Sequence, residues 1–191
     1  MESLKEKLSF EWNARLVAIT GVMIAVVFVM TYATKIPVGF GGYIHLGDTM
    51  VYAASFLFGP LVGVIAAAFG TSISDLAAGY GNYAPGTFII HGLQGLVAGL
   101  IAWRGGLNRM IAAGIAGGAI VVVGYFIYES AILQIGVGAA WTNAGLNVVQ
   151  VASGAIIGIP LVLAIRKAYP PINNWAYNRS WTEEPSKPTR A

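Results

Sequence analysis

The stretch AFGTSISDLAAGYGNYAPGTFIIHGLQG, residues 68–95, places an aspartate, a histidine and a glutamine inside an otherwise apolar part of the chain. Apolar runs of about 20 residues extend to either side, and this length crosses a hydrocarbon layer about 30 Å thick. Polar side chains in such segments are costly unless they face the protein interior or a water-filled cavity. The stretch therefore predicts two membrane helices with polar groups gathered near the turn between them.

The composition of the whole chain agrees with a membrane protein. Of its 191 residues, 57% are hydrophobic and 10% are charged, whereas soluble domains carry about 25% charged residues. There is no cysteine, which excludes disulfides and thiol chemistry. The net charge of +3 comes from basic residues that flank apolar segments, so we expect a lipid bilayer as the partner and no nucleic acid.

The apolar runs predict an all-α integral membrane protein, a bundle of six transmembrane helices. Residues 1–13 form an N-terminal segment, 14–168 the membrane domain, and 169–191 a largely disordered tail rich in proline and polar residues, with Trp175 and Trp181 at the interface. The second span is too short for a straight crossing. The predicted spans are 14–36, 49–58, 60–79, 87–103, 110–133 and 144–165.

Basic residues set the expected orientation. In a six-span chain, one side carries nearly all of the Lys and Arg that flank the spans, and the other side offers only Lys35. The positive-inside rule then puts both termini in the cytoplasm. The basic residues on the cytoplasmic side are Lys5, Lys7, Arg15, Arg104, Arg109, Arg166 and Lys167.

The polar side chains of the spans fall at a similar depth, near the outer ends. Helical spacing puts several on common faces: Asn143, Asn147 and Gln150 follow i, i+4, i+7, while Tyr125 and Glu129 are four apart. We expect these faces to enclose a polar cavity open to the outside, with aromatic rings suited to a small heteroaromatic ligand. The candidate ligand-binding residues are Tyr43, His45, Asp48, Asp75, Tyr83, His91, Gln94, Tyr125, Glu129, Trp141, Asn143, Asn147 and Gln150.

Other readings of these residues stay open. The carboxylates of Asp75 and Glu129 could pair with His91 or cap helix ends, the amide stripe could join helices, and the aromatics could form an interfacial belt. An intramembrane enzyme using Asp75, His91 and Glu129, or a purely structural subunit, are the alternative functions. No metal-ligand, nucleophile-elbow or phosphate-loop motif is present, so we expect no enzyme activity, no metal and no cofactor.

Two runs carry a family resemblance. YIHLGDTMVYAASFLFGPLVGVIAAAFGTSISDLAAGY and YAPGTFIIHGLQGLVAGLI resemble the substrate-binding S components of energy-coupling factor (ECF) vitamin transporters, in the riboflavin-like and hydroxymethylpyrimidine-like branch. The resemblance implies a multi-pass protein of the cell membrane that captures a vitamin outside. It also implies partners: a transmembrane coupling subunit and two ATPase subunits, on which the S component topples to release its ligand inside.

The resemblance also implies a docking surface on the first span. ARLVA, with Ala14 and Ala18, matches the family's AxxxA pattern, and Gly21 and Ala25 continue that face. The outer end has few cations, which ranks carboxylate-bearing vitamins low. A neutral or weakly basic ring remains, such as hydroxymethylpyrimidine, pyridoxine, thiamine or riboflavin, and we favour the smaller pyrimidine or pyridine class.

Overall fold

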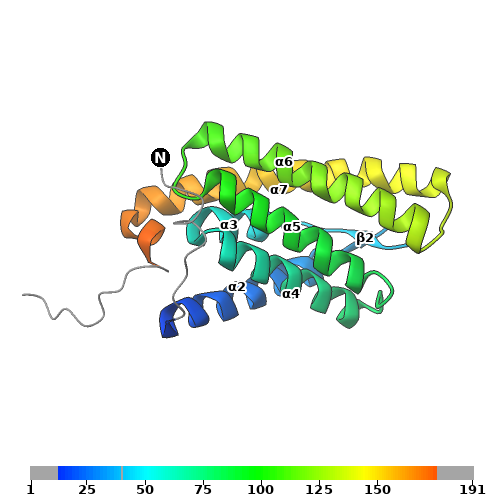
Figure 1. Cartoon of the computed structure of the whole chain (residues 1–191), viewed down its shortest axis with the longest axis horizontal. Helices are drawn as coiled ribbons and strands as arrows, with labels where there is room; N and C mark the ends of the chain where they lie inside the picture. Colours follow the sequence, from blue (N-terminus) through cyan, green and yellow to red (C-terminus); the bar gives the residue numbers. More distant parts are fainter. Residues whose placement is uncertain (1–12, 40, 176–191) are drawn as a thin grey trace, which may run out of the picture.

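The computed structural model describes residues 13–39 and 41–175, and it shows a bundle of helices aligned along one long axis (Figure 1). This part of the chain contains six α-helices, a short hairpin, a π-helical turn and a 3-10 turn. In chain order the elements are α2 (Ala14–Ala33), β1 (Ile36–Pro37), β2 (Tyr43–Ile44), α3 (Asp48–Phe58), α4 (Pro60–Ala78), α5 (Ala84–Ala102), α6 (Leu107–Ile127), η1 (Tyr128–Ile132), α7 (Val137–Ala168) and η2 (Pro170–Asn174).

Local sequence explains where the helices begin and end. Asn13 caps α2, because its side-chain oxygen accepts a hydrogen bond from the backbone N–H of Leu16 at 2.8 Å. Gly59 has a φ of 89°, which suits glycine, and Pro60 then opens α4 at a position where no backbone N–H is needed. Gly79 ends α4 in the left-handed conformation, with a φ of 84°.

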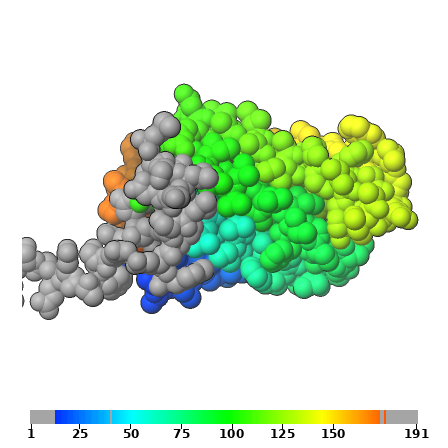
Figure 2. All heavy atoms as spheres, viewed as in Figure 1, coloured from blue at the N-terminus to red at the C-terminus, as the bar shows by residue number. Residues whose placement is uncertain are grey.

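Five of the described helices are long and apolar enough to cross a membrane, and α3 is the exception. Its 11 residues rise only about 16 Å. Ten of them are buried and Met50 is partly exposed, so α3 lies inside the bundle. In Figure 2, cyan atoms of this part of the chain are visible between the green and the blue ones. The sequence predicted a short helix at 49–58, which the structure contains, but it counted this helix as one of six spans, and only five of the described helices meet the length of a span.

The outer surface of the bundle is apolar. Large aliphatic side chains stand out on several helices, with Val22 on α2, Ile115 on α6 and Ile156 on α7 exposed by 61%, 70% and 73%. Together with the five long apolar helices, this surface describes a multi-pass membrane protein. The described ends of α2 and α7, at Ala14 and Ala168, lie at the same end of the bundle (Figure 1). We call the other end, where β1 and β2 lie, the hairpin end.

Several helix boundaries differ from the sequence prediction by three residues or more. The first span ends at Ala33, and the chain then forms the β1–β2 hairpin, in which Ile36 pairs with Ile44. The last helix begins at Val137, so most of the predicted loop 134–143 is helical. Gly136, with a φ of 95°, makes the sharp turn that starts the helix early.

The segment after α7 is the remaining difference. Residues 170–174, expected in a disordered tail, form the 3-10 turn η2, and Ile172 packs against the main hydrophobic core. The carbonyl of Trp175 accepts a hydrogen bond from Arg15 at 3.2 Å, which ties this segment to α2. Trp181 lies outside the described residues.

Candidate functional site

A cavity lies at the hairpin end, between β2, α4, α5, α7 and the junction of α6 with η1. Its volume is about 30 Å³, which is room for about two water molecules. Nine of the thirteen predicted ligand-binding residues line it: Tyr43, His45, Asp75, Tyr83, Tyr125, Glu129, Asn143, Asn147 and Gln150. These nine residues come from seven different elements or turns, and the fold places them around one space, as the sequence pattern predicted.

The loop between β1 and β2 covers one side of the cavity. Gly41 and Gly42 have φ values of 94° and 76°, and both line the cavity. A Cβ atom at Gly42 would lie 3.3 Å from Cζ of Tyr83. Glycine therefore serves two needs here, a left-handed turn and a close approach of the backbone to an aromatic ring.

Asp75 enters the cavity from the last turn of α4. Its Oδ1 atom accepts a hydrogen bond from the Tyr43 hydroxyl at 2.6 Å, and that hydroxyl also lies 3.1 Å from Oγ of Ser74. Burial and the neighbouring charge of Asp75 raise the pKa of Tyr43 far above its usual range, so the hydroxyl keeps its proton. The second oxygen of Asp75, Oδ2, is buried without a hydrogen-bond partner.

Glu129 enters from η1, where the helix widens into a π-helical turn. Its Oε1 atom accepts from Asn143 Nδ2 at 3.0 Å and from the Tyr83 hydroxyl at 3.3 Å. Its Oε2 atom is buried without a partner. Single π-helical turns inside α-helices often mark functional sites, and this one directs a carboxylate into the cavity.

Thr87 also lines the cavity, although it was not among the predicted binding residues. Its hydroxyl lies 2.7 Å from the Tyr125 hydroxyl, so α5 and α6 are joined at this depth. Thr87 is four residues before His91 on the same helix face. That spacing was the signal that could have identified it.

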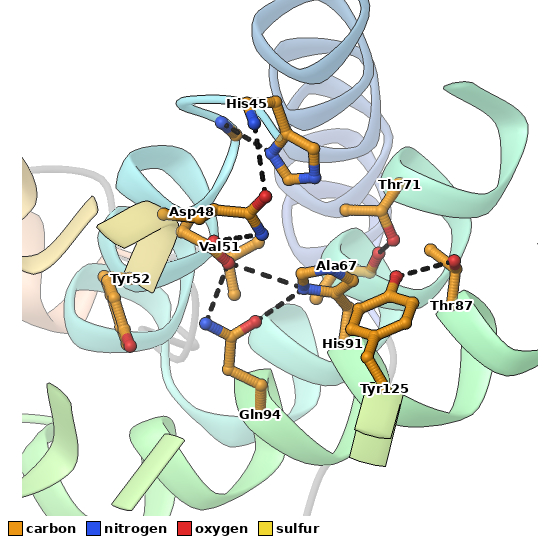
Figure 3. A network of polar contacts seen from close by, with 12 residues as sticks. His45, Asp48, Val51, Tyr52, Ala67, Thr71, Thr87, His91, Gln94 and Tyr125 are labelled. Atoms are coloured by element: carbon orange, nitrogen blue, oxygen red, sulfur yellow. Dashed lines mark hydrogen bonds and ion pairs between the residues drawn. The ribbon is translucent and has the colours of Figure 1, made fainter. Parts of the chain in front are cut away.

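Three of the predicted residues lie beneath the cavity in a buried network (Figure 3). Asp48, the first residue of α3, accepts hydrogen bonds from Gln94 Nε2 and from Gln150 Nε2, both at 2.8 Å. Nδ1 of His91 lies 2.6 Å from Oε1 of Gln94 and 3.4 Å from Oδ1 of Asp48. Asp48, His91 and Gln94 are fully buried, so the network bonds α3, α5 and α7 to each other without water.

Gln150 connects this network to the hairpin. Its Oε1 atom accepts from the backbone N–H of His45 at 3.2 Å, while its Nε2 atom bonds Asp48. The Nδ1 atom of His45 accepts from the backbone N–H of Gly47 at 3.1 Å, so in the neutral ring the proton is on Nε2. Burial, with a contribution from nearby His91, lowers the pKa of His45 to about 4, although Asp48 opposes the shift.

This buried imidazole predicts a loss of stability in acid. The pKa of His45 falls from 6.5 to about 4 on folding, so the unfolded chain takes up the proton first as the pH drops. The contribution is fully present above pH 6.5 and is lost as the pH falls towards 4, by about 3 kcal/mol when protonation is complete. Thermal unfolding in detergent from pH 8 to pH 4 measures it.

The control for this prediction is His45→Asn, which retains an acceptor for Gly47 but does not titrate. Carboxylates distant from residue 45 titrate in the same way in both proteins, so their contribution cancels in the comparison. Asp48 is the exception, because its charge interacts with His45. The variant should lose less stability than the parent chain between pH 6.5 and pH 4. Parallel curves for the two proteins would contradict the assigned role of His45.

Trp141 is the predicted binding residue that the structure does not bring to this site. It is 65% exposed on the outer surface of α7 and packs on Phe126, with ring centroids 4.8 Å apart. Because α7 begins at Val137, Trp141 is already helical, and it points away from the face that Asn143 and Asn147 share. Expecting a loop here placed Trp141 wrongly beside the ligand.

The four residues predicted to dock a partner, Ala14, Ala18, Gly21 and Ala25, all lie on the exposed side of α2. A Cβ atom at Gly21 would meet nothing within 4 Å. Among the described residues, no group of three or more His, Asp or Glu side chains is arranged to hold a metal ion.

The fold and the cavity together define a membrane protein with an internal site for a small ligand. A family model described as "ECF-type riboflavin transporter, S component" matches residues 11–167, and the chain belongs to this family of ECF transporter S components. The family, and the relative HmpT named below, are described as transporters, as the sequence resemblance implied.

Two curated proteins are similar in sequence. An uncharacterised protein of Pyrococcus woesei is 34% identical over 149 residues, covering 76% of this chain and 98% of that protein. The thiamine precursor transporter HmpT of Lactococcus lactis is 33% identical over 153 residues, covering 79% of this chain and 87% of HmpT. Among solved structures, FolT bound with folic acid superposes with a TM-score of 0.67 at 20% identity, covering 80% of this chain and 95% of FolT. That likeness shows a shared fold.

Proposed function

We propose that the chain is the substrate-binding subunit of an ECF-type importer and captures a small heteroaromatic vitamin or vitamin precursor. The observation that carries this proposal is the cavity itself, in which two buried carboxylates, Asp75 and Glu129, each keep one oxygen without a partner. Buried polar atoms normally have hydrogen-bond partners, so a ligand is the natural partner here. Hydroxymethylpyrimidine, pyridoxine, thiamine and riboflavin remain the candidates.

The relatives support a substrate of this kind. HmpT is named as a thiamine precursor transporter, and the matched family is described by riboflavin. The small volume of the cavity favours the smaller rings, because every candidate must displace the β1–β2 loop and riboflavin must displace it furthest. At 33% identity, the substrate of HmpT cannot be assigned to this chain from the sequence alone. The choice between these candidates therefore depends on the chemistry of the cavity.

The orientation and the partners belong to the same proposal. With both termini in the cytoplasm of a cell-membrane protein, the hairpin end faces outwards and receives the ligand. The exposed face of α2 then docks on a transmembrane coupling subunit, which two ATPase subunits drive. The chain itself performs no reaction on its ligand. The basic residues of the sequence and the exposed small side chains of α2 support this arrangement.

The first test is identification of small molecules released from the detergent-purified chain by denaturation, followed by calorimetric titration of each candidate. Calorimetry is preferable to tryptophan fluorescence, because Trp141 lies outside the cavity. A stoichiometric heteroaromatic vitamin supports the proposal. If no small molecule is released and none of the four candidates gives a heat of binding, the proposal is contradicted, and the structural or enzymatic alternative is favoured.

The docking surface gives a prediction of its own. Gly21→Trp should leave ligand binding by the isolated chain unchanged, because none of the described residues lies within 4 Å of a Cβ atom at this position. It should lower vitamin uptake by cells by about tenfold or more, since a bulky ring there prevents close approach of a partner helix. Uptake of the labelled vitamin, with binding measured in parallel, separates the two effects.

Ile156→Trp is the matched control for this variant. Ile156 is 73% exposed on α7, so the change adds a ring of the same size to a lipid-facing surface away from α2. Uptake by this control should equal that of the parent chain. Equal loss in both variants would indicate a general effect of the added ring rather than a docking surface on α2.

A further inference from the structure

The unpaired polar atoms of the cavity are all of one kind. Among the cavity-lining residues of the described chain, three side-chain atoms are buried without a hydrogen-bond partner: Asp75 Oδ2, Glu129 Oε2 and Asn143 Oδ1. The three side chains are exposed by 4%, 3% and 4%. Each of these atoms is an acceptor, and leaving it unpaired in a buried position is unfavourable. A ligand that relieves all three must supply donors.

Most hydrogen-bond donors of the cavity wall already have an acceptor within the protein. The Tyr43 hydroxyl donates to Asp75, while the Tyr83 hydroxyl and the Asn143 amide donate to Glu129. The Gln150 amide donates downwards to Asp48. Each of these groups is therefore satisfied by a carboxylate of the protein and is not free for a carboxylate of the ligand.

The charge of the wall points the same way. Two carboxylates line the cavity, and the lining residues within the described ranges include no Lys or Arg. The donors left are neutral: the His45 imidazole, the Asn147 amide and one hydroxyl proton of Thr87 or Tyr125, which share a single hydrogen bond. An anionic ligand would find no compensating cation here, whereas an amine or a protonated ring would find two carboxyl groups that can accept its hydrogen bonds.

Size limits the ligand further. A volume of about 30 Å³ holds neither a single ring nor a fused three-ring system unless the β1–β2 loop moves away from Tyr83. A single ring requires the least displacement of Gly41 and Gly42, which press on that tyrosine. Size therefore favours a compact ring only through the smaller movement that it requires.

From these observations we infer that the ligand is a single-ring amino-heterocycle, recognised through its hydrogen-bond donors by the unpaired oxygens of Asp75 and Glu129. This inference rests on the proposed function and narrows it to one substrate class. The inferred ligand differs from folic acid, the carboxylate-bearing ligand of the structural neighbour. It also differs from riboflavin, which the family description names. The neutral donors of His45 and Asn147 would face a ring nitrogen that accepts.

A matched pair of probes tests the inference. 4-Amino-5-hydroxymethyl-2-methylpyrimidine and its 4-oxo counterpart have nearly the same size, but the oxo group replaces the donating amino group by an acceptor. Calorimetry on the detergent-purified chain should find the amino compound bound at least about a hundredfold more tightly, because a site built for a donor rejects an analogue that lacks it. Riboflavin and folic acid complete the panel and should bind more weakly than the amino compound.

The possible results separate the inference from the proposed function. Equal or tighter binding of the oxo compound, riboflavin or folic acid overturns the inference and leaves the vitamin-binding function standing. If no compound of the panel binds and no small molecule co-purifies, the proposed function itself is overturned, and the inference with it.

Two isosteric variants assign the selectivity to the carboxylates. In Asp75→Asn and Glu129→Gln, one oxygen can still accept from Tyr43 or Tyr83, while the unpaired acceptor becomes a donor. Each variant should bind the amino compound at least about tenfold more weakly than the parent chain does. The ratio of its affinities for the amino and the oxo compound should also be smaller than in the parent chain. Ser130→Ala is the control, because that hydroxyl bonds only the backbone of its own helix. An unchanged preference in both variants, with thermal midpoints near that of the parent, contradicts the inference.

Discussion

Asp48→Ala should be among the most destabilising substitutions in the chain. Asp48 is fully buried and accepts hydrogen bonds from Gln94 and Gln150, with His91 nearby at 3.4 Å. Removing the carboxylate leaves these side chains buried without their partner, which costs about 3–5 kcal/mol in buried ion-pair networks. A protein with a stability of about 5–15 kcal/mol is then close to unfolding.

Size-exclusion yield and the thermal midpoint in detergent measure this effect. Asp48→Asn retains one acceptor oxygen, so it should fall between Asp48→Ala and the parent chain. Asn108→Ala, at an exposed position in the first turn of α6, should leave the midpoint unchanged. If Asp48→Ala melts like the parent, the network does not hold α3, α5 and α7 together.

Gly95→Val should have an effect of similar size, for a steric reason. A Cβ atom at Gly95 would overlap the carbonyl oxygen of Gly63 and lie 2.7 Å from its carbon, so α4 and α5 would have to separate. Overpacking of a close contact usually costs about 1–3 kcal/mol, and backbone atoms yield less than side chains. We expect a cost at or above the upper value, measured as a fall in the thermal midpoint and in folded yield.

Gly145→Val is the control, since it makes the same change in helix propensity. Gly145 lies on the exposed side of α7, where an added Cβ atom would meet nothing within 4 Å. Any loss that the two variants share comes from propensity, and the excess in Gly95→Val comes from the helix crossing. An equal loss in both would falsify the packing explanation.

Much of the site followed from helical periodicity. Asn143, Asn147 and Gln150 share one face at any position of the helix ends, because the period of 3.6 residues fixes their relative directions. The same holds for Tyr125 and Glu129, although the π-helical turn that presents Glu129 was not predicted. The position of Asp75 near the end of its helix was predicted from the nearby turn at Gly79.

Contacts that depend on how deep a residue lies in the bundle, or on the path of a loop, could not be predicted from the sequence. Asp48 meets Gln94 and Gln150 only because the β1–β2 hairpin brings the chain back into the bundle before α3 begins. A glycine-rich loop contains no periodic pattern that shows this path. Trp141 was misplaced for a related reason, since the sequence around it combines glycine with good helix formers and tertiary packing decided between them.

The burial of α3 limits how this protein can change over evolutionary time. The other helices have lipid-facing positions, such as Val22 and Ile156, where one apolar side chain can replace another with little consequence. In α3 only Met50 is not fully enclosed, so almost every replacement there meets a neighbour on another helix. Sequence drift in α3 therefore has to proceed by coupled exchanges with α4, α5 and α7, and new ligand preferences should arise more readily from the loops and the ends of the long helices.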